Sequence, residues 1–468
     1  MSFKKYLIFL LFFFSIIWIS GEEKSITLFA TSDLHGNIDS EGAGILRLAT
    51  VLKKEITTVG GFEKSIIIDC GDFSQGGIES SLTKGGIIFE LLDHLHYDVI
   101  IPGNHDFDYG LEKLIANQKA ISSEMLCGNL LLFGAKNPFK SWKIFNKNGL
   151  KIAVMGVTYP GIKGIDSGNN FSYKTDSINE TIKKILPEVV SEKPDLIVLA
   201  AHGGRYNSGW SLKNIIRKFP EIDIVFAGHT HEEIPGELLY NRIYFIQTGS
   251  HAKYLGEAIV KISNGKKSIN SRLIPVFGAK VDQALAEKIK SSLNNLKIGA
   301  NKIIARSKNK VDLSLLTMNS MIEKTKADVA ILGLSEFSRY IKGKIRYKDV
   351  FSIIPYEDTI VTMVVNRSEL QTILQELYSY MKKKRKYKRV LFTGFSLKQV
   401  HGKITNLKFD KKNFDEEKIV LTLSSYYIEY PSNKFPEIKR IAKNSRSEYK
   451  NTGVLIRDTL IAYLANLR

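Results

Sequence analysis

The sequence predicts an α/β domain followed by an α+β domain. Between residues 24 and 275, short apolar runs alternate with segments whose apolar residues recur at helical spacing, which is typical of buried strands covered by helices. The 468 residues are 44% hydrophobic and 25% charged and include only 11 Pro and 35 Gly, which excludes disordered and collagen-like classes. At roughly 150 residues per domain, this length predicts two to three domains.

The chain opens with a predicted export leader over residues 1–20. Lys4 and Lys5 precede an unbroken apolar run over 6–19, and a polar stretch begins at Ser20. A basic start before an apolar run too short for an ordinary membrane span is typical of a secretory signal. A buried N-terminal helix fits less well, because the run has no polar face. We expect a periplasmic or extracellular protein, or a membrane-anchored one if the leader stays uncleaved.

Six apolar runs are the predicted strands of the first domain, expected over residues 24–275. They are residues 26–30, 66–68, 99–101, 152–157, 196–201 and 224–227. Helical spacing between them occurs in residues 45–52, 88–95 and 178–185. This order of elements predicts strands that are buried on both faces.

A polar segment over residues 281–300 is the predicted linker helix, because it has no strand neighbours of its own. The remaining residues, 301–468, are expected to form the α+β domain. Its predicted strands are residues 328–332, 360–365, 390–397, 404–409 and 419–423, with helices near 368–381 and 453–467.

Cysteine content and charge limit the possible partners. Cys70 and Cys127 are too few for a disulfide framework and lie in apolar surroundings typical of small core residues, although one disulfide between them stays open without a distance. An excess of 67 Lys and Arg over 48 Asp and Glu gives a formal charge of +19, which favours anionic partners. The densest basic run, Lys382 to Arg389, predicts either a solvated surface or a contact with an anionic surface.

Polar side chains follow five of the predicted strands. They are Asp33, His35, Asp72, Asn104, His105, Asp108, His202, His229 and His231. Open α/β sheets build ligand sites at the carboxyl ends of their strands, and residues i and i+2 of an extended chain point to one side. Mixed imidazole, carboxylate and carboxamide ligands indicate a pair of transition metals, not an all-oxygen Ca²⁺ or Mg²⁺ site. The other four histidines, His94, His96, His251 and His401, are assigned no role.

These strand-end residues resemble the signature of a known family. Asp33-x-His35, Gly71-Asp72, Gly103-Asn104-His105-Asp106, Ala201-His202-Gly203-Gly204 and Gly228-His229-x-His231 are similar to the calcineurin-like metallophosphoesterase motifs. Residues 71–76 and 103–110 more narrowly resemble the 5′-nucleotidase family, and looser likeness at 347–351, 354–356 and 452–458 extends into the second domain. The resemblance implies a sandwich of two mixed sheets flanked by helices, followed by a substrate-binding C-terminal domain.

The resemblance also implies a ligand set for two divalent ions, which would be zinc, manganese, cobalt or iron. Asp33, His35, Asp72 and His231 would hold one ion. Asp72, Asn104, His202 and His229 would hold the other, so that Asp72 bridges the two.

The implied activity is hydrolysis of nucleoside 5′-monophosphates or related small phosphate esters to nucleoside and phosphate, by attack of a metal-activated water. His105 would be catalytic, because it is adjacent to the ligand Asn104, and Asp108 would orient its imidazole. The alternatives are a 2′,3′-cyclic nucleotide phosphodiesterase, a nucleotide-sugar hydrolase, or a basic surface-binding protein with a vestigial phosphatase.

The second domain departs from the family pattern where substrate is bound. No Gly-Gly-Ile-Arg element follows residues 328–332, and Arg339 is either its substitute or a surface arginine. The Gly-Gly-Asp-Gly-Tyr segment is replaced by residues 424–431, in which Tyr426 is either a base-stacking aromatic or a core residue. Asp358 stands where Asn is common. We therefore expect weaker discrimination between nucleoside monophosphates and simple phosphomonoesters than is typical of the family.

Overall fold

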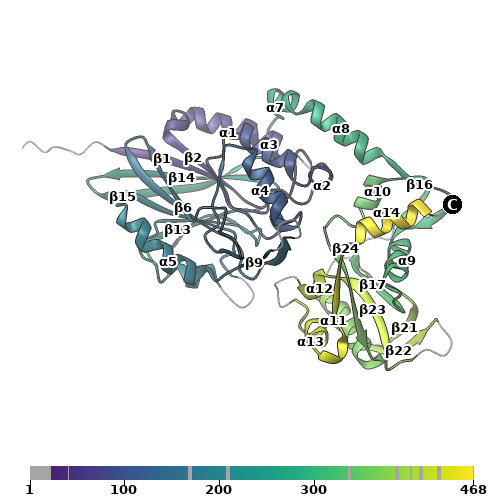
Figure 1. The fold of residues 1–468 in the computed structure, drawn as a ribbon. Helices are drawn as coiled ribbons and strands as arrows, with labels where there is room; N and C mark the ends of the chain where they lie inside the picture. Colours follow the sequence, from purple (N-terminus) through teal and green to yellow (C-terminus); the bar gives the residue numbers. More distant parts are fainter. Residues whose placement is uncertain are drawn as a thin grey trace, which may run out of the picture.

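The computed structural model shows two parts joined by a pair of helices (Figure 1). It describes residues 23–40, 42–166, 171–206, 211–335, 339–384, 389–400, 403–410, 415–429 and 434–466. The predicted leader and the side chains of the basic run Lys382 to Arg389 lie outside the described residues. Among the helices described, none is both long and apolar enough to cross a membrane.

The first part contains two six-stranded mixed sheets. One has the order β15 (Lys266–Pro275), β14 (Tyr254–Ser263), β1 (Lys24–Thr31), β2 (Ser65–Asp69), β3 (Val99–Ile100) and β4 (Glu124–Met125). The other has the order β12 (Glu233–Leu239), β13 (Ile243–Thr248), β11 (Ile224–Ala227), β10 (Leu196–Ala201), β7 (Leu150–Val157) and β6 (Trp142–Lys147). Strands β1 to β4 are parallel, as are β7, β10, β11 and β13, and antiparallel strands occupy the remaining positions. The predicted sandwich of two mixed sheets is confirmed.

Successive side chains of a strand point to opposite faces of its sheet, so each strand contributes side chains to two hydrophobic layers. Ile66 and Ile68 of β2 lie in the core between the sheets, whereas Ile67 packs under helices α1 (Ile45–Val59), α3 (Gly86–His94) and α4 (Leu111–Lys119). On the second sheet, Met155 packs under α5 (Ile178–Ser191) and α6 (Leu212–Ile216). Cys70 and Cys127 are buried free thiols in these cores.

Local signals fix the ends of these helices. Helix α1 ends at Gly60, whose φ of 94° places it in the left-handed region that glycine favours. Helix α5 begins at Ser177, whose side chain accepts the backbone N–H of Glu180.

The smaller elements of this part are helix α2 (Ile78–Thr83), two 3₁₀ turns (Phe62–Lys64 and His105–Phe107), and the sheet of β5 (Leu130–Phe133), β9 (Phe171–Thr175) and β8 (Lys163–Asp166).

The segment predicted as one linker helix over 281–300 forms two consecutive helices, α7 (Gln283–Lys288) and α8 (Lys290–Asn301). They cross from the first part of the molecule to the second (Figure 1). Asp282 caps α7 by accepting the N–H of Leu285. Lys53 of α1 forms an ion pair with the same carboxylate and so ties the linker to the first part.

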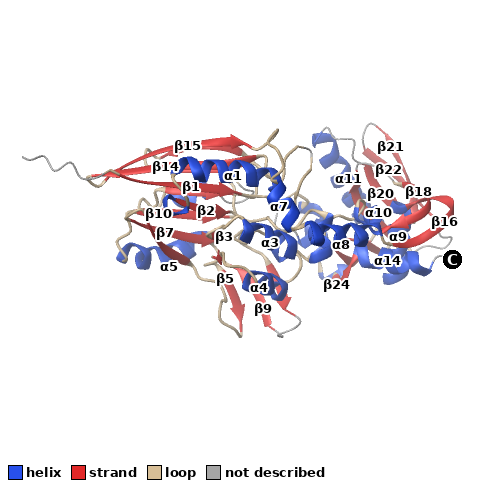
Figure 2. Cartoon of the chain, turned by 90° about the horizontal axis from the view of Figure 1, so that it is seen from above, coloured by secondary structure: helices blue, strands red, loops and turns tan. Residues whose placement is uncertain are grey.

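The second part is built on a five-stranded sheet. Figure 2 shows this part at the opposite end of the molecule from the two large sheets. Its order is β20 (Arg389–Thr393), β17 (Val329–Ser335), β23 (Ile419–Ser424), β19 (Thr359–Val365) and β24 (Lys450–Leu455). Two ribbons accompany it, β16 (Ile303–Asp312) with β18 (Tyr340–Arg346), and β21 (Phe395–Val400) with β22 (Lys403–Phe409). The helices are α9 (Leu313–Thr325), α10 (Tyr347–Phe351), α11 (Arg367–Lys384), α12 (Tyr426–Glu429), α13 (Pro436–Ala442) and α14 (Ile456–Asn466), and a 3₁₀ turn spans Ser445–Ser447.

Two predicted elements of this part have different bounds. The strand expected over 390–397 divides at Gly394, whose φ of 95° turns the chain from β20 into β21. The helix expected over 453–467 begins only at Ile456, because residues 450–455 pair with β19 as strand β24.

Candidate metal centre

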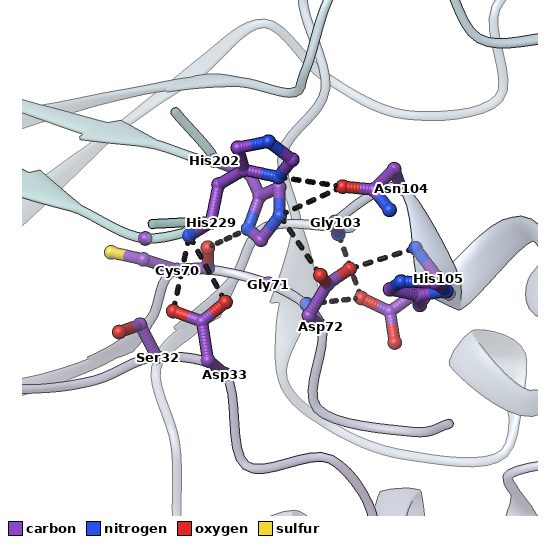
Figure 3. A network of polar contacts seen from close by, with 12 residues as sticks. Ser32, Asp33, Cys70, Gly71, Asp72, Gly103, Asn104, His105, His202 and His229 are labelled. Atoms are coloured by element: carbon purple, nitrogen blue, oxygen red, sulfur yellow. Dashed lines mark hydrogen bonds and ion pairs between the residues drawn. The ribbon is translucent and has the colours of Figure 1, made fainter. Parts of the chain in front are cut away.

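Five loops of the first part converge at one edge of the two sheets. They follow β1, β2 and β3 of one sheet and β10 and β11 of the other. Figure 3 shows Asp33, Asp72, Asn104, His202 and His229 from these loops with their polar atoms turned toward one another. The structure therefore brings the residues of five separate strand ends into one site.

One cluster of potential ligands consists of Asp33, His35 and His231, whose ligand atoms lie within 4.8 Å of one another. The Nε2 atom of His231 is 3.4 Å from Oδ1 of Asp33 and 3.1 Å from Nε2 of His35. The Nδ1 atom of His35 lies 3.2 Å from the carbonyl oxygen of Gln75. A proton on Nδ1 that is bonded to this carbonyl leaves the Nε2 lone pair for a metal.

The second cluster consists of Asp72, His202 and His229. Nε2 of His202 is 3.2 Å from Oδ2 of Asp72, and Oδ1 of Asn104 lies 2.9 Å from Nδ1 of His229. Nδ1 of His202 is 2.7 Å from the carbonyl oxygen of Cys70, which again leaves Nε2 for a metal. This donor set of imidazole, carboxylate and carboxamide suits borderline transition metals.

The protonation states of Asp72, His35 and His229 suit metal binding, whereas His202 must first release a proton. Burial would lower the pKa of His202, but the carboxylate of Asp72 raises it to about 9. Burial would raise the pKa of Asp72, but the imidazoles of His202 and His105 hold it well below the usual range. Burial lowers the pKa of His35 to about 4 and, together with the nearby His202, that of His229 to about 3. An ionised carboxylate and neutral imidazoles are the forms that bind a cation.

Five of the seven predicted ligands have left-handed backbone conformations. The φ angles are 53° at Asp33, 48° at His35, 56° at Asp72, 76° at His229 and 57° at His231. Such conformations are uncommon for residues other than glycine and cluster at functional sites. The strain is consistent with a site built to turn these side chains inward.

The glycine of the Gly-Asn-His motif is required sterically. A Cβ on Gly103 would lie 2.2 Å from Oδ1 of Asp72. The hydrogen of a glycine is therefore the only substituent that fits beside this carboxylate.

His105 belongs to neither cluster and is paired with Asp108. The distance from its Nδ1 to Oδ2 of Asp108 is 2.8 Å, and its backbone N–H donates to Oδ1 of Asp72 at 2.7 Å. Burial would lower the pKa of His105, but the carboxylates of Asp108 and Asp72 raise it to about 10. The structure thus places a paired imidazole beside the carboxylate that is predicted to bridge the metals.

A cavity of about 1060 Å³ opens over both clusters. His35, Asp72, His105 and His231 line it from the first part, Lys297 of α8 from the linker, and Tyr356 from the second part. The Tyr356 ring centroid lies 6.0 Å from that of His105. Residues about 250 positions apart in the sequence, such as His105 and Tyr356, therefore line the same cavity.

Comparison with known proteins identifies the family. Residues 26–233 match the model of the calcineurin-like phosphoesterases, and residues 298–420 match that of the 5′-nucleotidase C-terminal domain. Together the two models match more than two thirds of the chain. The chain belongs to the calcineurin-like phosphoesterase family. As a member with a 5′-nucleotidase C-terminal domain, it is a metal-dependent hydrolase of phosphoester bonds.

Several relatives match this phosphoesterase over nearly its whole length. It is 24% identical to Protein UshA of Yersinia enterocolitica, covering 96% of this chain and 92% of that protein. It is 25% identical to a 5′-nucleotidase of Vibrio cholerae, covering 96% and 91%. The crystal structure of a 5′-nucleotidase precursor from Thermus thermophilus has the same fold, with a TM-score of 0.65 at 17% identity, covering 95% and 96%.

Sequence reasoning missed three residues of the phosphoesterase site. His251, which was assigned no role, lines the cavity with its ring centroid 5.3 Å from that of His35. Asp106 is buried and accepts the N–H groups of Asp72 and Gly103 on one oxygen and the N–H and O–H of Ser74 on the other. Its place in the Gly103–Asp106 motif was a signal for such a role. Tyr356 lies in the 354–356 stretch, whose looser likeness to the family did not indicate a role for its ring.

The structure shows which neighbours Arg339 and Tyr426 of the second part contact. Arg339 pairs with Asp349 and bonds Ser352, so it is a partly exposed arginine with local partners. The Tyr426 ring packs against Tyr427 and Phe435, with centroids 5.4 and 6.1 Å away. Of the two alternatives for Tyr426, core packing describes these contacts better.

Proposed function

We propose that this phosphoesterase hydrolyses nucleoside 5′-monophosphates or closely related small phosphate esters to nucleoside and phosphate. One observation carries the proposal: the two ligand clusters and the His105–Asp108 pair share a cavity with an aromatic ring from the second part. The 5′-nucleotidase of Vibrio cholerae, which the chain matches over most of both lengths, supports the same substrate class.

We propose that Asp33, His35, Asp72 and His231 hold one divalent ion, and that Asp72, Asn104, His202 and His229 hold the second. The fixed Nδ1 bonds of His35 and His202 support this assignment, because they orient Nε2 toward the clusters. When bound, two divalent cations supply the positive charge that attracts phosphate oxygens and makes a water molecule more acidic.

The other roles in the proposed reaction fall to His105, Asp108 and Asp106. Asp108 accepts the Nδ1 proton of His105, which fixes the ring and leaves Nε2 as a donor to a phosphoryl or leaving-group oxygen. The backbone N–H of His105 holds one oxygen of Asp72 in place. Asp106 fixes the backbone of Asp72 and Gly103, so it positions the proposed ligand loops without contacting the cations.

The Tyr356 ring supplies a surface for a nucleobase. It is 50% exposed and lines the same cavity as the ligand clusters. Stacking of a base on an aromatic ring contributes about 1 to 3 kcal/mol in nucleic-acid binders. We therefore propose that residues 24–275 carry the catalytic site, residues 281–300 link the domains, and residues 301–468 bind the nucleoside.

A substrate panel tests this function. Nucleoside 5′-monophosphates, 2′,3′-cyclic nucleotides, nucleotide sugars and p-nitrophenyl phosphate would be assayed with Mn²⁺, Co²⁺, Zn²⁺ or Fe²⁺. We expect the highest kcat/KM with a nucleoside monophosphate. Preference for the cyclic nucleotides or the nucleotide sugars would replace the proposal with one of those activities. No turnover of any phosphate ester would support a vestigial site.

We further propose that the chain is exported. The support is the basic start and short apolar run of residues 1–20. Fractionation of cells that express the full chain with a C-terminal tag would locate the protein, and N-terminal sequencing would show whether the leader is cleaved. A cytoplasmic, full-length product would contradict export.

A further inference from the structure

The positive charge of this protein is unevenly distributed along the chain. Residues 301–468 contain 33 Lys and Arg against 17 Asp and Glu, whereas residues 1–300 contain 34 against 31. Most of the formal excess of +19 therefore belongs to the second part. Charge asymmetry between two halves of a chain indicates an anionic partner for the charged half.

Part of this charge lies on the exposed side of the antiparallel ribbon of β16 and β18. Apolar residues of the ribbon pack with Leu313 of α9 and with Leu460 and Leu464 of α14; they are Ala305, Val311, Ile341 and Ile345. Five cations of the ribbon are exposed, and we call them the basic ribbon: Arg306, Lys308, Lys310, Lys342 and Lys344.

The basic ribbon lacks neutralising partners. Within the part of the chain that the structure describes, none of its five cations forms an ion pair with a carboxylate. Arg306 lies directly opposite Lys344 in the register, and like charges at opposed positions destabilise a strand pair. The nearby Asp312 caps α9, and Asp349 pairs with Arg339. An anionic partner would relieve this repulsion.

We propose that the basic ribbon binds single-stranded nucleic acid. Arg306 lies opposite Lys344 in the register, and Lys308 and Lys310 follow in the segment between Ser307 and Val311, where the register shifts. Together these exposed cations can contact several phosphates of one backbone. The Tyr340 ring at the end of β18 is 58% exposed, with the Lys310 ammonium 5.1 Å from its centroid. Cations next to an exposed aromatic ring are the combination used to bind single strands.

The chemistry of the exposed side favours nucleic acid over a lipid surface. Between residues 306 and 310 of β16 and residues 340 and 344 of β18, the exposed side chains are cationic or polar apart from the tyrosine ring. A surface that inserts into a membrane presents aliphatic side chains to the acyl chains, and these two segments of the ribbon expose none. The ribbon lies at the end of the molecule away from the two large sheets in both Figure 1 and Figure 2, so bound polymer would leave the catalytic cavity open.

Fluorescence anisotropy with a 20-nucleotide oligothymidine, labelled with fluorescein at its 5′ end, tests the proposal. The ribbon variant carries Arg306→Gln, Lys308→Gln, Lys342→Gln and Lys344→Gln. The matched control carries Lys64→Gln, Lys119→Gln, Lys183→Gln and Lys184→Gln, four exposed lysines of the first part. Both variants lose the same formal charge. Thermal unfolding and far-ultraviolet circular dichroism of both variants would confirm that they are folded.

We expect the ribbon variant to bind the oligonucleotide at least about 10-fold more weakly than wild type at 0.1 M salt, and the control within about 2-fold. The slope of log Kd against log salt should fall by about 2 to 3 in the ribbon variant, because each phosphate contact in a single strand contributes about 0.7. Equal weakening in both variants, or no binding by wild type, would overturn the proposal. So would ribbon-dependent binding to phosphatidylglycerol vesicles without oligonucleotide binding. None of these outcomes depends on the proposed nucleotidase activity.

Discussion

Asp72 belongs to the second ligand cluster and is the residue proposed to bridge the two ions. Its Oδ2 lies 3.2 Å from Nε2 of His202, and its Oδ1 accepts the N–H of His105. We predict that Asp72→Asn lowers the metal content from two ions to one or fewer and abolishes turnover, because a neutral amide cannot replace a bridging carboxylate. Elemental analysis of the purified variant measures the metals. Two retained ions, or a wild type that stays active after exhaustive chelation, would contradict the assignment.

His105 provides the complementary prediction, because it lies outside both clusters. His105→Asn should lower kcat by roughly 10² or more while leaving metal content near that of wild type, which is the usual scale for a positioned acid or electrostatic group. Asp108→Asn should have a smaller effect in the same direction, because it removes only the acceptor for Nδ1. Loss of metal in His105→Asn would instead assign the residue to the ligand set.

The carboxyl group of Asp358 should make the free energy of unfolding depend on pH. Burial raises its pKa to about 6, and Ser424 donates a hydrogen bond to it. Because the folded-state pKa lies above the usual aspartate pKa of 3.8, which applies to the unfolded chain, its contribution to stability is present below about pH 4 and is lost as the pH rises through about 6. Asp358→Asn should therefore raise the free energy of unfolding by up to about 3 kcal/mol at pH 8.

The same Asp358→Asn substitution should have little effect near pH 4, because the wild-type carboxyl is then neutral in the folded protein. Thermal unfolding of both proteins between pH 4 and pH 8 measures the difference. A gain in melting temperature that is constant across this range would show that the carboxyl does not titrate as described.

At the scale of elements, a buried arginine of α14 joins the two parts of the molecule. Arg457 donates to Ser81 of α2, to Glu357, and to the carbonyl oxygens of Ile354 and Tyr356. It is 4% exposed and Glu357 is 7% exposed. This side chain therefore holds the loop that carries Tyr356 against the helix that follows the Asp72 loop.

Removing this arginine should loosen the contact between the two parts. Arg457→Met should destabilise the protein by about 3 kcal/mol, because breaking a buried pair leaves a charge without its partner. It should also raise KM for AMP more than KM for p-nitrophenyl phosphate, because Tyr356 would lose its fixed position. The double variant Arg457→Met with Glu357→Gln should recover part of the stability.

The matched control is Arg440→Met, which breaks an exposed pair with Glu437 in the same part of the chain. An exposed pair contributes at most about 1 kcal/mol. Thermal unfolding and steady-state kinetics of the two variants give the comparison. Similar losses in Arg457→Met and Arg440→Met would show that the buried arginine has no special role.

At the scale of the whole molecule, substrate preference depends on both parts. Tyr356→Ala should lower kcat/KM for AMP by about 10-fold while changing that for p-nitrophenyl phosphate less than about 3-fold, because only the nucleotide has a base to stack. Tyr426→Ala is the comparison, since Tyr426 packs in the core. A larger loss of AMP preference in Tyr426→Ala would show that the base is bound by residue 426 instead.

The sequence by itself determined six interior strands of the two large sheets and the residues at their ends. A strand buried on both faces must be apolar throughout, so residues 66–68, 196–201 and 224–227 could be recognised from composition alone. The polar side chains that follow are local features of the chain. That is why residues such as Asp72 and His202 could be expected near one another before their distance was known.

Only the tertiary structure decided how these pieces are partnered. The spacing and number of apolar residues predict a strand but not which sheet it joins. The residues alone therefore could not distinguish a sandwich of two sheets from a single doubly wound sheet. The missed strands include the sheet edges β6, β12, β15 and β24 and the ribbon of β16 and β18, because one side of each faces solvent and their apolar content is low. Tyr356 reaches His105, and His251 reaches His35, through packing between segments more than 200 residues apart. Such contacts depend on long-range packing, which no local pattern in the sequence records.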